Sequence, residues 1–310
     1  MSEPPRQTRS YLMSLFERHG ANPRHDLGQN FLIDLNLHDY IVAQAGITAD
    51  DVVLEVGTGT GALTSAIAKD ADRVITVEYD RRVHEIAKEL LQSRPHVTLL
   101  NCDVLKNKNR FNPEVLEAVT AALGERPEGS VQSLKLVANL PYNVATPVMS
   151  NLIATDLPWT RMVVTIQYEL AERMAAAPGS SQYSALTVWL QAQTKVTLLK
   201  KLGPNVFWPR PQVDSAIVRI DPDPAARATI HDREFFHTFL RDVFTQRRKR
   251  LRGVIASMFK ATHDKPAVDA AFERAGVSTE ARAEDLSPGD LVRLSNELAI
   301  RPSGEPAETE

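Results

Sequence analysis

Short apolar runs alternate with amphipathic stretches from about residue 50 to residue 220. The runs are DVVLEVG (51–57), RVITVEYD (73–80), HVTLLNCD (96–103), LKLVANLP (134–141), RMVVTIQYE (161–169), KVTLLKKL (195–202) and SAIVRID (215–221). Helical patterns separate most of them, near 61–69, 81–92, 113–123, 145–154 and 182–193. This alternation predicts an α/β fold with a mostly parallel, doubly wound sheet. The last two runs follow each other without a helix, which predicts an antiparallel hairpin at the sheet edge.

The flanking segments have different patterns. Residues 1–26 form a polar N-terminal extension in which SYLMSLFERHG (10–20) predicts a short amphipathic helix ending at Gly20. DPDPAARA (221–228) contains two prolines and predicts a linker. We therefore predict a main domain over 27–222 and a small helical domain over 229–301. The polar tail 302–310 is expected to be disordered.

Composition narrows the class of protein. The 310 residues include 43% apolar and 24% charged residues, which is ordinary for a globular protein, and no apolar run is long enough to span a bilayer. Cys102 is the only cysteine, which excludes an intramolecular disulfide and favours the cytoplasm, and its simplest role is that of a small buried apolar residue. No His/Cys cluster has metal-ligand spacing, so we expect no metal. We also expect a monomer.

A glycine loop follows the first strand. In VVLEVGTGTGALTSAIAK the strand ends near Glu55, and Gly57, Gly59 and Gly61 precede a helix. Glycines let the backbone approach a ligand closely, and the helix N-terminus adds free N–H groups. The loop alone is equally typical of a tight turn between a strand and a helix.

Two carboxylates at the next strand ends make the loop more informative. Glu78 lies 21 residues after Gly57, at the distance where an acidic residue accepts hydrogen bonds from ribose hydroxyls, and Asp103 ends the third strand. This acidic pocket suits an adenosine cofactor without phosphates. The positively charged S-adenosylmethionine therefore fits better than NAD, which carries a pyrophosphate.

The fourth strand ends in Asn139-Leu140-Pro141-Tyr142. The lone pair of an adenine amino group is delocalised into the ring. The Asn139 side-chain oxygen and the Leu140 carbonyl can each accept one of its hydrogens and turn the lone pair toward a methyl donor. Pro141 has no competing N–H, and Tyr142 offers a face on which an unstacked base can lie. The motif resembles that of methyltransferases acting on exocyclic amino groups of bases, which implies methylation of such a group, achieved mainly by alignment. No tuned general base is needed, because the methylated nitrogen is strongly acidic.

Over residues 9–300 the chain resembles the ribosomal RNA adenine dimethyltransferase family. The motifs that carry the resemblance occur in the family's order and spacing. They are LGQNFLID (27–34), LEVGTGTGALT, VEYD, NCDVL, VANLPYNVATPVM, QYELAERMAAAPGSSQYSALTVWLQ, VFWPRPQVDSAIVRI and FTQRRKRLR. The resemblance implies a Rossmann-like class I methyltransferase sheet and S-adenosylmethionine-dependent dimethylation of the 6-amino group of two adjacent adenines. The implied substrate is 16S RNA of the small ribosomal subunit, during ribosome biogenesis.

The resemblance also implies roles for individual residues. Asn30 and Leu32 would close over the cofactor, Gly57 would lie beneath its methionine end, Glu78 on its ribose and Asp103 at its adenine. Asn139 would stand between cofactor and substrate, and Phe207 would face Tyr142 across the target base. Phe207 is also readable as an ordinary core residue.

Three positions depart from the family pattern. Asp26 precedes Leu27 where a basic or small residue is expected, although Arg24 is close by. Thr58 replaces the proline common in the cofactor loop and should change affinity modestly. Tyr168 replaces a common lysine, which weakens any expectation of a phosphate contact there.

The basic run RDVFTQRRKRLR (241–252) stands out in a chain of net charge −3. On a helix, its side chains, including Arg247, Arg248 and Lys249, would spread over more than one face, so some must be exposed. A solvated helix face is the common fate of such a run. Its density and its place in the family pattern favour contacts with RNA phosphates.

Two other functions stay open. One is methylation of large-subunit RNA by a related erythromycin-resistance-type enzyme. The other is a non-catalytic ribosome-assembly or transcription factor on the same fold, against which the intact Glu78, Asp103 and Asn139–Tyr142 motif argues.

Overall fold

The computed structural model describes residues 7–24, 27–124 and 133–299. A seven-stranded sheet has the order β4-β3-β2-β7-β8-β11-β9. Its strands are β2 (Val52–Val56), β3 (Arg73–Val77), β4 (Val97–Leu100), β7 (Leu134–Asn139), β8 (Trp159–Gln167), β9 (Thr194–Leu202) and β11 (Ser215–Pro222). The pairs from β4 to β8 are parallel, and β11 pairs antiparallel with β8. The predicted mostly parallel sheet with an antiparallel hairpin at one edge is confirmed.

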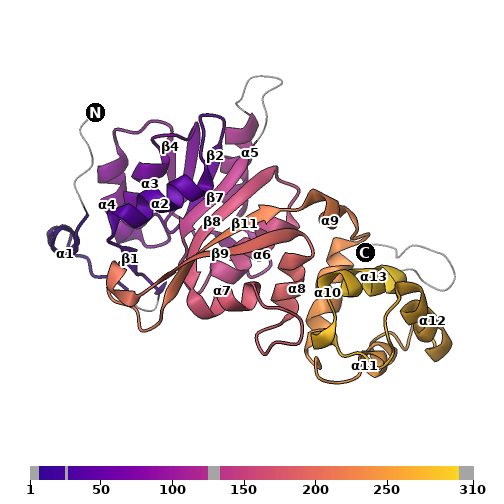
Figure 1. The fold of residues 1–310 in the computed structure, drawn as a ribbon. Helices are drawn as coiled ribbons and strands as arrows, with labels where there is room; N and C mark the ends of the chain where they lie inside the picture. The colour runs from indigo at the N-terminus through magenta and orange to yellow at the C-terminus, as the bar shows by residue number, and fades with distance from the viewer. Residues whose placement is uncertain (1–6, 25–26, 125–132, 300–310) are drawn as a thin grey trace. The chain divides into compact units, whose positions relative to one another are not determined.

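Helices lie on both faces of this sheet (Figure 1). They are α2 (Leu35–Ala45), α3 (Ala62–Ile67), α4 (Arg81–Leu91), α5 (Pro113–Gly124), α6 (Ala145–Ala154) and α7 (Tyr168–Met174). The central strand β2 is buried along its whole length and β7 is buried as far as Ala138, because each face has its own helical cover. Val53, Val137 and Val163 from three strands pack with Ile41 of α2 and Ile67 of α3 in one apolar cluster. The sequence-predicted helices of this part each match an observed helix.

The N-terminal helix α1 (Arg9–Arg18) is also the one predicted from its amphipathic pattern. Thr8 caps it, and its buried face includes Leu12, Leu15 and Phe16. Phe16 lies 5.2 Å from Phe31 between ring centroids. Phe31 belongs to β1 (Phe31–Leu32), which pairs antiparallel with β10 (Phe207–Trp208), and β5 (Leu105–Asn107) pairs with β6 (Arg110–Phe111).

The chain divides into two compact units. The first contains residues up to 171 together with 197–221, and the second contains 172–196 and the residues from 222 onward. The second unit is helical. It contains α8 (Ala185–Gln191), α9 (Pro224–Ala228), α10 (Arg233–Phe244), α11 (Leu251–Met258), α12 (Lys265–Ala275) and α13 (Pro288–Ala299).

The sequence assigns residues 172–196 to the larger domain, whereas they pack within the helical unit. Tyr183 lies 5.9 Å from Phe244 and Trp189 lies 6.2 Å from Phe236, measured between ring centroids. The expected linker contains a short helix, α9, because Asp223 caps its N-terminus and Pro224 starts it with a suitable φ. The predicted disordered tail, 302–310, lies outside the described residues. Within the described part of the chain, no helix has the length and apolar content needed to cross a bilayer.

Candidate active site

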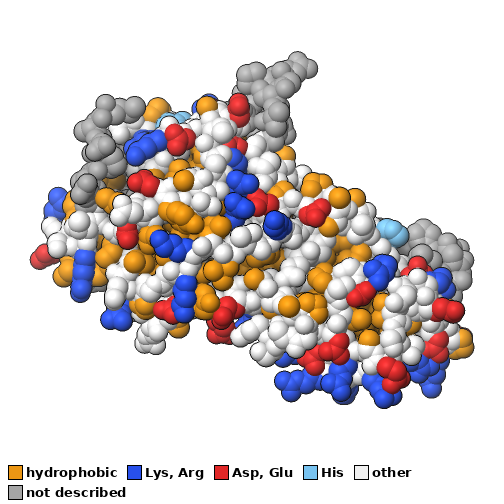
Figure 2. Space-filling model, in the orientation of Figure 1, with side chains coloured by type: hydrophobic (Ala, Val, Ile, Leu, Met, Phe, Trp, Pro, Cys, Tyr) orange, Lys and Arg blue, Asp and Glu red, His pale blue; other side chains and the backbone are white. Residues whose placement is uncertain are grey.

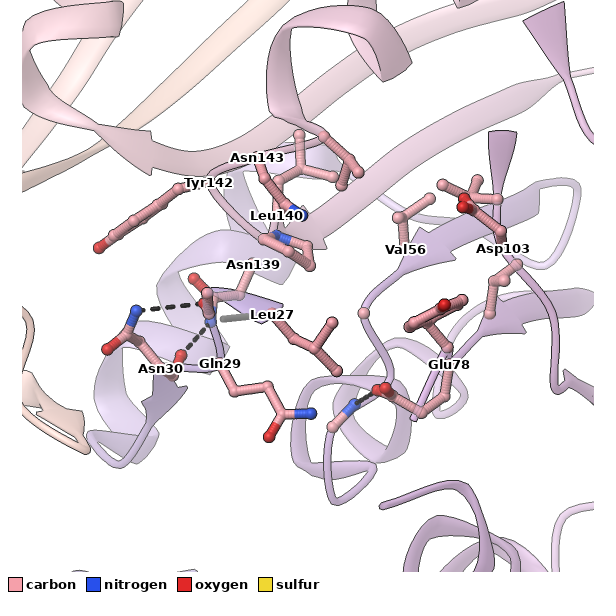
Figure 3. A pocket seen from close by; sticks show the side chains of 18 of the residues that line it. Leu27, Gln29, Asn30, Val56, Glu78, Asp103, Asn139, Leu140, Tyr142 and Asn143 are labelled. Carbon is pink, nitrogen blue, oxygen red and sulfur yellow. Dashed lines mark hydrogen bonds between the residues drawn. The ribbon is translucent and has the colours of Figure 1, made fainter. Parts of the chain in front are cut away.

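A cavity of about 270 Å³ opens at the carboxyl ends of β2, β3, β4 and β7 (Figure 3). The carboxyl edge is where open α/β sheets bind ligands. The lining residues come from five segments of the first unit. They are Leu27–Phe31, Val56, Gly57 and Gly59, Val77–Tyr79, Cys102–Val104, and Asn139–Val144.

Gly57 forms the floor of the cavity in a conformation that requires glycine. Its φ is +83°, and a Cβ there would lie 3.0 Å from Pro141 Cδ. Its N–H donates to the Val77 carbonyl at 2.9 Å. The loop after β2 is thus held against β3 and also lies directly against Pro141 of the strand-end motif.

Glu78 is the buried carboxylate of the site. It accepts hydrogen bonds from the Gly59 N–H and the Asp80 N–H, each at 2.9 Å. Burial raises its pKa to about 7, although these backbone N–H groups oppose the shift. Asp103 is exposed at the neighbouring strand end and accepts the Leu105 N–H at 2.9 Å.

Asn139 lies between Tyr142 and the two acidic residues in Figure 3. Its Nδ2 donates to the Asn30 carbonyl at 2.8 Å, which leaves Oδ1 to accept a hydrogen bond. The Leu140 N–H donates to the Thr165 carbonyl at 3.1 Å and fixes the backbone of the motif. The motif side chains are therefore oriented before any ligand arrives.

The Tyr142 ring is oriented by its hydroxyl, which lies 2.8 Å from Ser215 Oγ on β11. Burial raises the pKa of this hydroxyl, and the bond to Ser215 partly offsets the shift. Asn30, Gly57, Glu78, Asp103, Asn139, Leu140, Pro141 and Tyr142 all line the one cavity. The cavity has the acceptors Glu78 and Asp103 at one end, and the oriented amide of Asn139 and ring of Tyr142 at the other. This arrangement suits the alignment of a planar amine with an adenosine-type cofactor.

Comparison with known proteins gives the family. Residues 20–300 match the family described as ribosomal RNA adenine dimethylase. The chain belongs to this family. The ribosomal RNA small subunit methyltransferase A of Shouchella clausii is 35% identical over 285 residues, covering 92% of this chain and 93% of the relative. The protein of the same name from Halothermothrix orenii is 36% identical over 284 residues, covering 91% and 90%.

Solved structures support the same conclusion. A dimethyladenosine transferase from Plasmodium falciparum has a TM-score of 0.69 and 25% identity, covering 84% of this chain and 94% of that chain. The 23S rRNA methyltransferase ErmE has a TM-score of 0.60 at 24% identity, covering 87% and 99%, and supports the fold alone. This member of the dimethylase family is thus a methyltransferase on a class I sheet, and its cofactor is S-adenosylmethionine.

The cavity of this dimethylase family member has donors and acceptors that fit the cofactor. The carboxylates of Glu78 and Asp103 are hydrogen-bond acceptors of the kind that ribose hydroxyls and an adenine amino group need, and Val56 and Val104 are apolar lining residues. The glycine at 57 leaves room where a side chain would meet Pro141. A cationic sulfonium also suits a site whose charged lining residues are acidic.

Leu32 and Phe207, which the resemblance places against the ligands, lie elsewhere. Both belong to the buried apolar cluster under α2, with 5% and 3% of their surface exposed, and they are partners in the β1–β10 pair. Neither is among the cavity-lining residues. Phe207 thus has the position of a core residue in this structure, and its place across the target base from Tyr142 stays a prediction.

The middle of the basic run, residues 245–250, lies in a turn between α10 and α11, whereas the sequence predicts one helix through the whole run; its two ends belong to these helices. The α10 helix ends at Phe244 and the next begins at Leu251. Arg247 points inward: its guanidinium donates to the Tyr183 carbonyl at 2.6 Å and lies 3.4 Å from Glu284. Arg248 and Lys249 are exposed. Of the three residues proposed for RNA binding, Arg247 has a structural role in the helical unit.

Acidic side chains lie among the basic ones on this unit. Arg250 pairs with Glu280 at 2.8 Å, and Arg252 pairs with Asp269 at 2.5 Å. Figure 2 shows blue Lys and Arg side chains at the lower edge of the helical unit with red Asp and Glu side chains between them. The usable positive charge is therefore smaller than the sequence run implies.

Sequence reasoning missed several lining residues. Tyr79, 59% exposed, follows Glu78 and could have been found from its position beyond a strand end. Gln29 bridges the Arg24 N–H and Asp80, a link that no local pattern shows. Cys102 also lines the cavity, but burial raises the pKa of its thiol to about 11, so it is a neutral, weak nucleophile.

Of the three departures from the family pattern, Thr58 and Tyr168 each have a contact, and Asp26 lies outside the described residues. Thr58 Oγ1 lies 2.7 Å from Thr76 Oγ1 beneath the cofactor loop. The Tyr168 ring lies 4.2 Å from Lys201 Nζ, which pairs with Asp214 at 2.9 Å. A lysine from β9 thus lies over the tyrosine ring.

Proposed function

We propose that this chain uses S-adenosylmethionine to dimethylate the 6-amino group of two adjacent adenines in the 16S RNA of the small ribosomal subunit. Relatives at 35–36% identity over about nine-tenths of the chain are named as small-subunit methyltransferases, which supports this substrate. These names favour it over a large-subunit substrate and over a factor without activity. We further propose that the protein acts as a monomer in the cytoplasm.

The observation that carries the proposal is the Asn139–Asn30 hydrogen bond. Because Asn139 Nδ2 is already used, its Oδ1 is available for one amino hydrogen of the adenine. The Leu140 carbonyl takes the other hydrogen. Both bonds favour a tetrahedral nitrogen with its lone pair directed along one axis, so they strengthen as the new bond forms.

The remaining motif residues hold the base. Pro141 keeps the backbone fixed without adding a competing donor. The Tyr142 ring, held by Ser215, provides the stacking face for an adenine that has left its helix.

Cofactor contacts come from the opposite end of the cavity. When bound, S-adenosylmethionine supplies an electrophilic methyl group on its sulfonium. Glu78 would accept hydrogen bonds from the ribose hydroxyls, Asp103 would accept one from the adenine amino group, and the Gly57 backbone would lie under the methionine end. Asn30 covers the site from the loop before β1.

We propose that only part of the basic run contacts the RNA backbone. Arg248 and Lys249 are exposed and can reach phosphates, whereas Arg247 is already bonded within its own unit. Phosphate contacts supply affinity without base specificity, so target choice falls to the shape of the subunit and the base cavity.

Methyl incorporation tests the function directly. Labelled cofactor is supplied with naked 16S RNA, small subunits lacking the modification, and large subunits, and the product nucleoside is identified. We expect dimethyladenosine in the small subunits. Incorporation confined to large subunits, or no incorporation while the cofactor binds, would contradict the proposal.

A paired substitution tests the RNA contacts. The double variant Arg248→Gln, Lys249→Gln should bind small subunits more weakly. The slope of log affinity against log salt concentration should also fall, by the amount that about two phosphate contacts contribute. The control removes equal charge from the first unit with Lys69→Gln and Lys88→Gln, both exposed. Arg247→Gln should instead lower thermal stability. Equal binding by the two double variants would show that the turn is only a solvated surface.

A further inference from the structure

A chain of buried hydroxyls runs beneath the cofactor loop to Glu55. Thr58 Oγ1 lies 2.7 Å from Thr76 Oγ1, and Thr76 Oγ1 donates to Glu55 Oε2 at 2.6 Å. Thr64 Oγ1 donates to the same oxygen at 2.5 Å. All four side chains are buried, none more than 4% exposed. Because Thr76 uses its single hydrogen on Glu55, Thr58 must be the donor in their bond.

The cofactor loop is hydrogen-bonded to three consecutive residues: Thr76 and Val77 of β3, and Glu78 directly after it. Thr58 bonds the side chain of Thr76, the Gly57 N–H and the Thr58 N–H donate to the Val77 carbonyl, and the Gly59 N–H donates to Glu78 Oε2 at 2.9 Å. Thr58 therefore sits between the buried Glu55 and the Gly59 N–H that orients the Glu78 carboxylate.

We propose that Glu55, Thr76 and Thr58 are positioning residues that set the cofactor affinity of the pocket by fixing the backbone of the loop. Glu55 is not among the lining residues, so it acts through the two threonines and not by touching the ligand. The inference rests on the proposed role of Glu78 at the cofactor ribose.

Energetics favour a role for Glu55 beyond filling space. Burial raises its pKa to about 8, and the two hydroxyls only partly oppose this. A buried carboxyl is costly to keep, and replacing it with an apolar side chain of similar size often leaves a protein equally stable. A fully bonded buried network, in contrast, fixes a unique geometry.

Thr64 separates two possible roles of the network. The network either fixes the backbone of the cofactor loop or only provides Glu55 with hydrogen-bond donors. It gives Glu55 a hydrogen bond as short as that from Thr76, but it lies on α3, beyond the loop. If the network only provides Glu55 with donors, losing the Thr76 hydroxyl and losing the Thr64 hydroxyl have the same effect on cofactor binding. If it positions the loop, only the Thr58 branch changes cofactor binding.

The experiment compares Thr58→Val, Thr58→Ser and Thr64→Val in the full chain. S-adenosylmethionine affinity is measured by calorimetry, and single-turnover methylation of small subunits is measured at saturating cofactor. Thr58→Val should weaken affinity roughly 2–10-fold, the effect of one net hydrogen bond, with the saturated rate within about twofold of the parent. Thr58→Ser should restore affinity, and Thr64→Val should lower the unfolding temperature with affinity unchanged.

Hydrogen exchange of the Gly57 and Gly59 amides, without any cofactor, provides a second measurement. Thr58→Val and Thr76→Val should each accelerate it, the double variant should add little more, and Thr64→Val should leave it unchanged. Parent-like affinity and exchange in Thr58→Val would overturn the inference. A parent chain that fails to bind S-adenosylmethionine would instead overturn the proposed function, and the exchange data would still decide whether the network fixes the loop.

Discussion

The buried acids at the two ends of β2 have pKa values that are shifted in opposite directions. Asp51, just before the strand, lies 2.7 Å from Lys135 Nζ. Burial alone would raise the pKa of Asp51, but hydrogen bonds from Lys135, Ser133 and the Thr48 N–H outweigh it and lower the pKa. Glu55, near the other end, accepts hydrogen bonds from hydroxyls, and burial raises its pKa to about 8.

The difference separates stability from function within one strand. At the amino end, Lys135 also donates to the Gly46 carbonyl at 2.5 Å, and Arg161 donates to the Gln44 carbonyl while pairing with Asp221. These cations neutralise acids and cap the C-terminus of α2. At the carboxyl end, Glu55 accepts from hydroxyls and Glu78 from backbone N–H groups, and burial raises the pKa of both. Only Glu78 lines the cavity, so its carboxylate is the one that a cationic ligand can meet.

Removing the cation at the amino end should have the largest effect. Lys135→Met leaves Asp51 buried without its partner and should lower the free energy of unfolding by about 3–5 kcal/mol at pH 7. Denaturant unfolding measures this. Adding Asp51→Asn should recover part of the loss. A change below about 1 kcal/mol would mean that the two ends do not differ as described.

The next effect is on chemistry at the carboxyl end. Asn139→Ala should reduce single-turnover methylation at saturating cofactor by at least about 100-fold, since one well-placed transition-state partner is lost. Tyr142→Ala should impair base capture, and Tyr142→Phe should be mild because the ring face remains. Near-normal turnover in Asn139→Ala would reduce the motif to a structural turn.

Cofactor affinity should respond to Glu78. Glu78→Ala should weaken S-adenosylmethionine binding by about 1–3 kcal/mol. With a pKa of about 7 in the free protein, affinity in the parent should also fall as the pH drops below 7, because the ionised carboxylate accepts hydrogen bonds from both hydroxyls. Calorimetry from pH 5.5 to pH 8 tests both statements. Unchanged affinity in a folded variant would remove Glu78 from the site.

Per pH unit, the smallest effect is the change of stability with pH. The folded-state pKa of Glu55, about 8, lies above its usual value of 4.5, so the folded protein binds the proton more tightly than the unfolded chain. Stability should therefore fall as the pH rises from about 5 to 8, and Glu55→Gln should reduce this slope by up to about 1 kcal/mol per pH unit. Unfolding curves across that range measure the slope. An unaltered slope would show that Glu55 is ionised when buried.

The sequence was sufficient for the sheet, its helices and the residues at strand ends. Apolar runs report burial directly, and the carboxyl ends of parallel strands must meet at one edge. It was insufficient where contacts between distant segments decide the outcome. Arg247 looked free because its partners Tyr183 and Glu284 are remote in sequence, and the burial of Phe207 depends on its pairing with Leu32.

The close approach of Gly57 to Pro141 couples the two loops of the site sterically. The loop that faces the methyl donor and the loop that faces the acceptor share a boundary with no room for a Cβ. A Cβ at 57 is disfavoured twice, by the positive φ and by the contact with Pro141. Gly57→Ala should therefore weaken S-adenosylmethionine binding, and a smaller residue at 141 should recover only the part of the loss that comes from the contact.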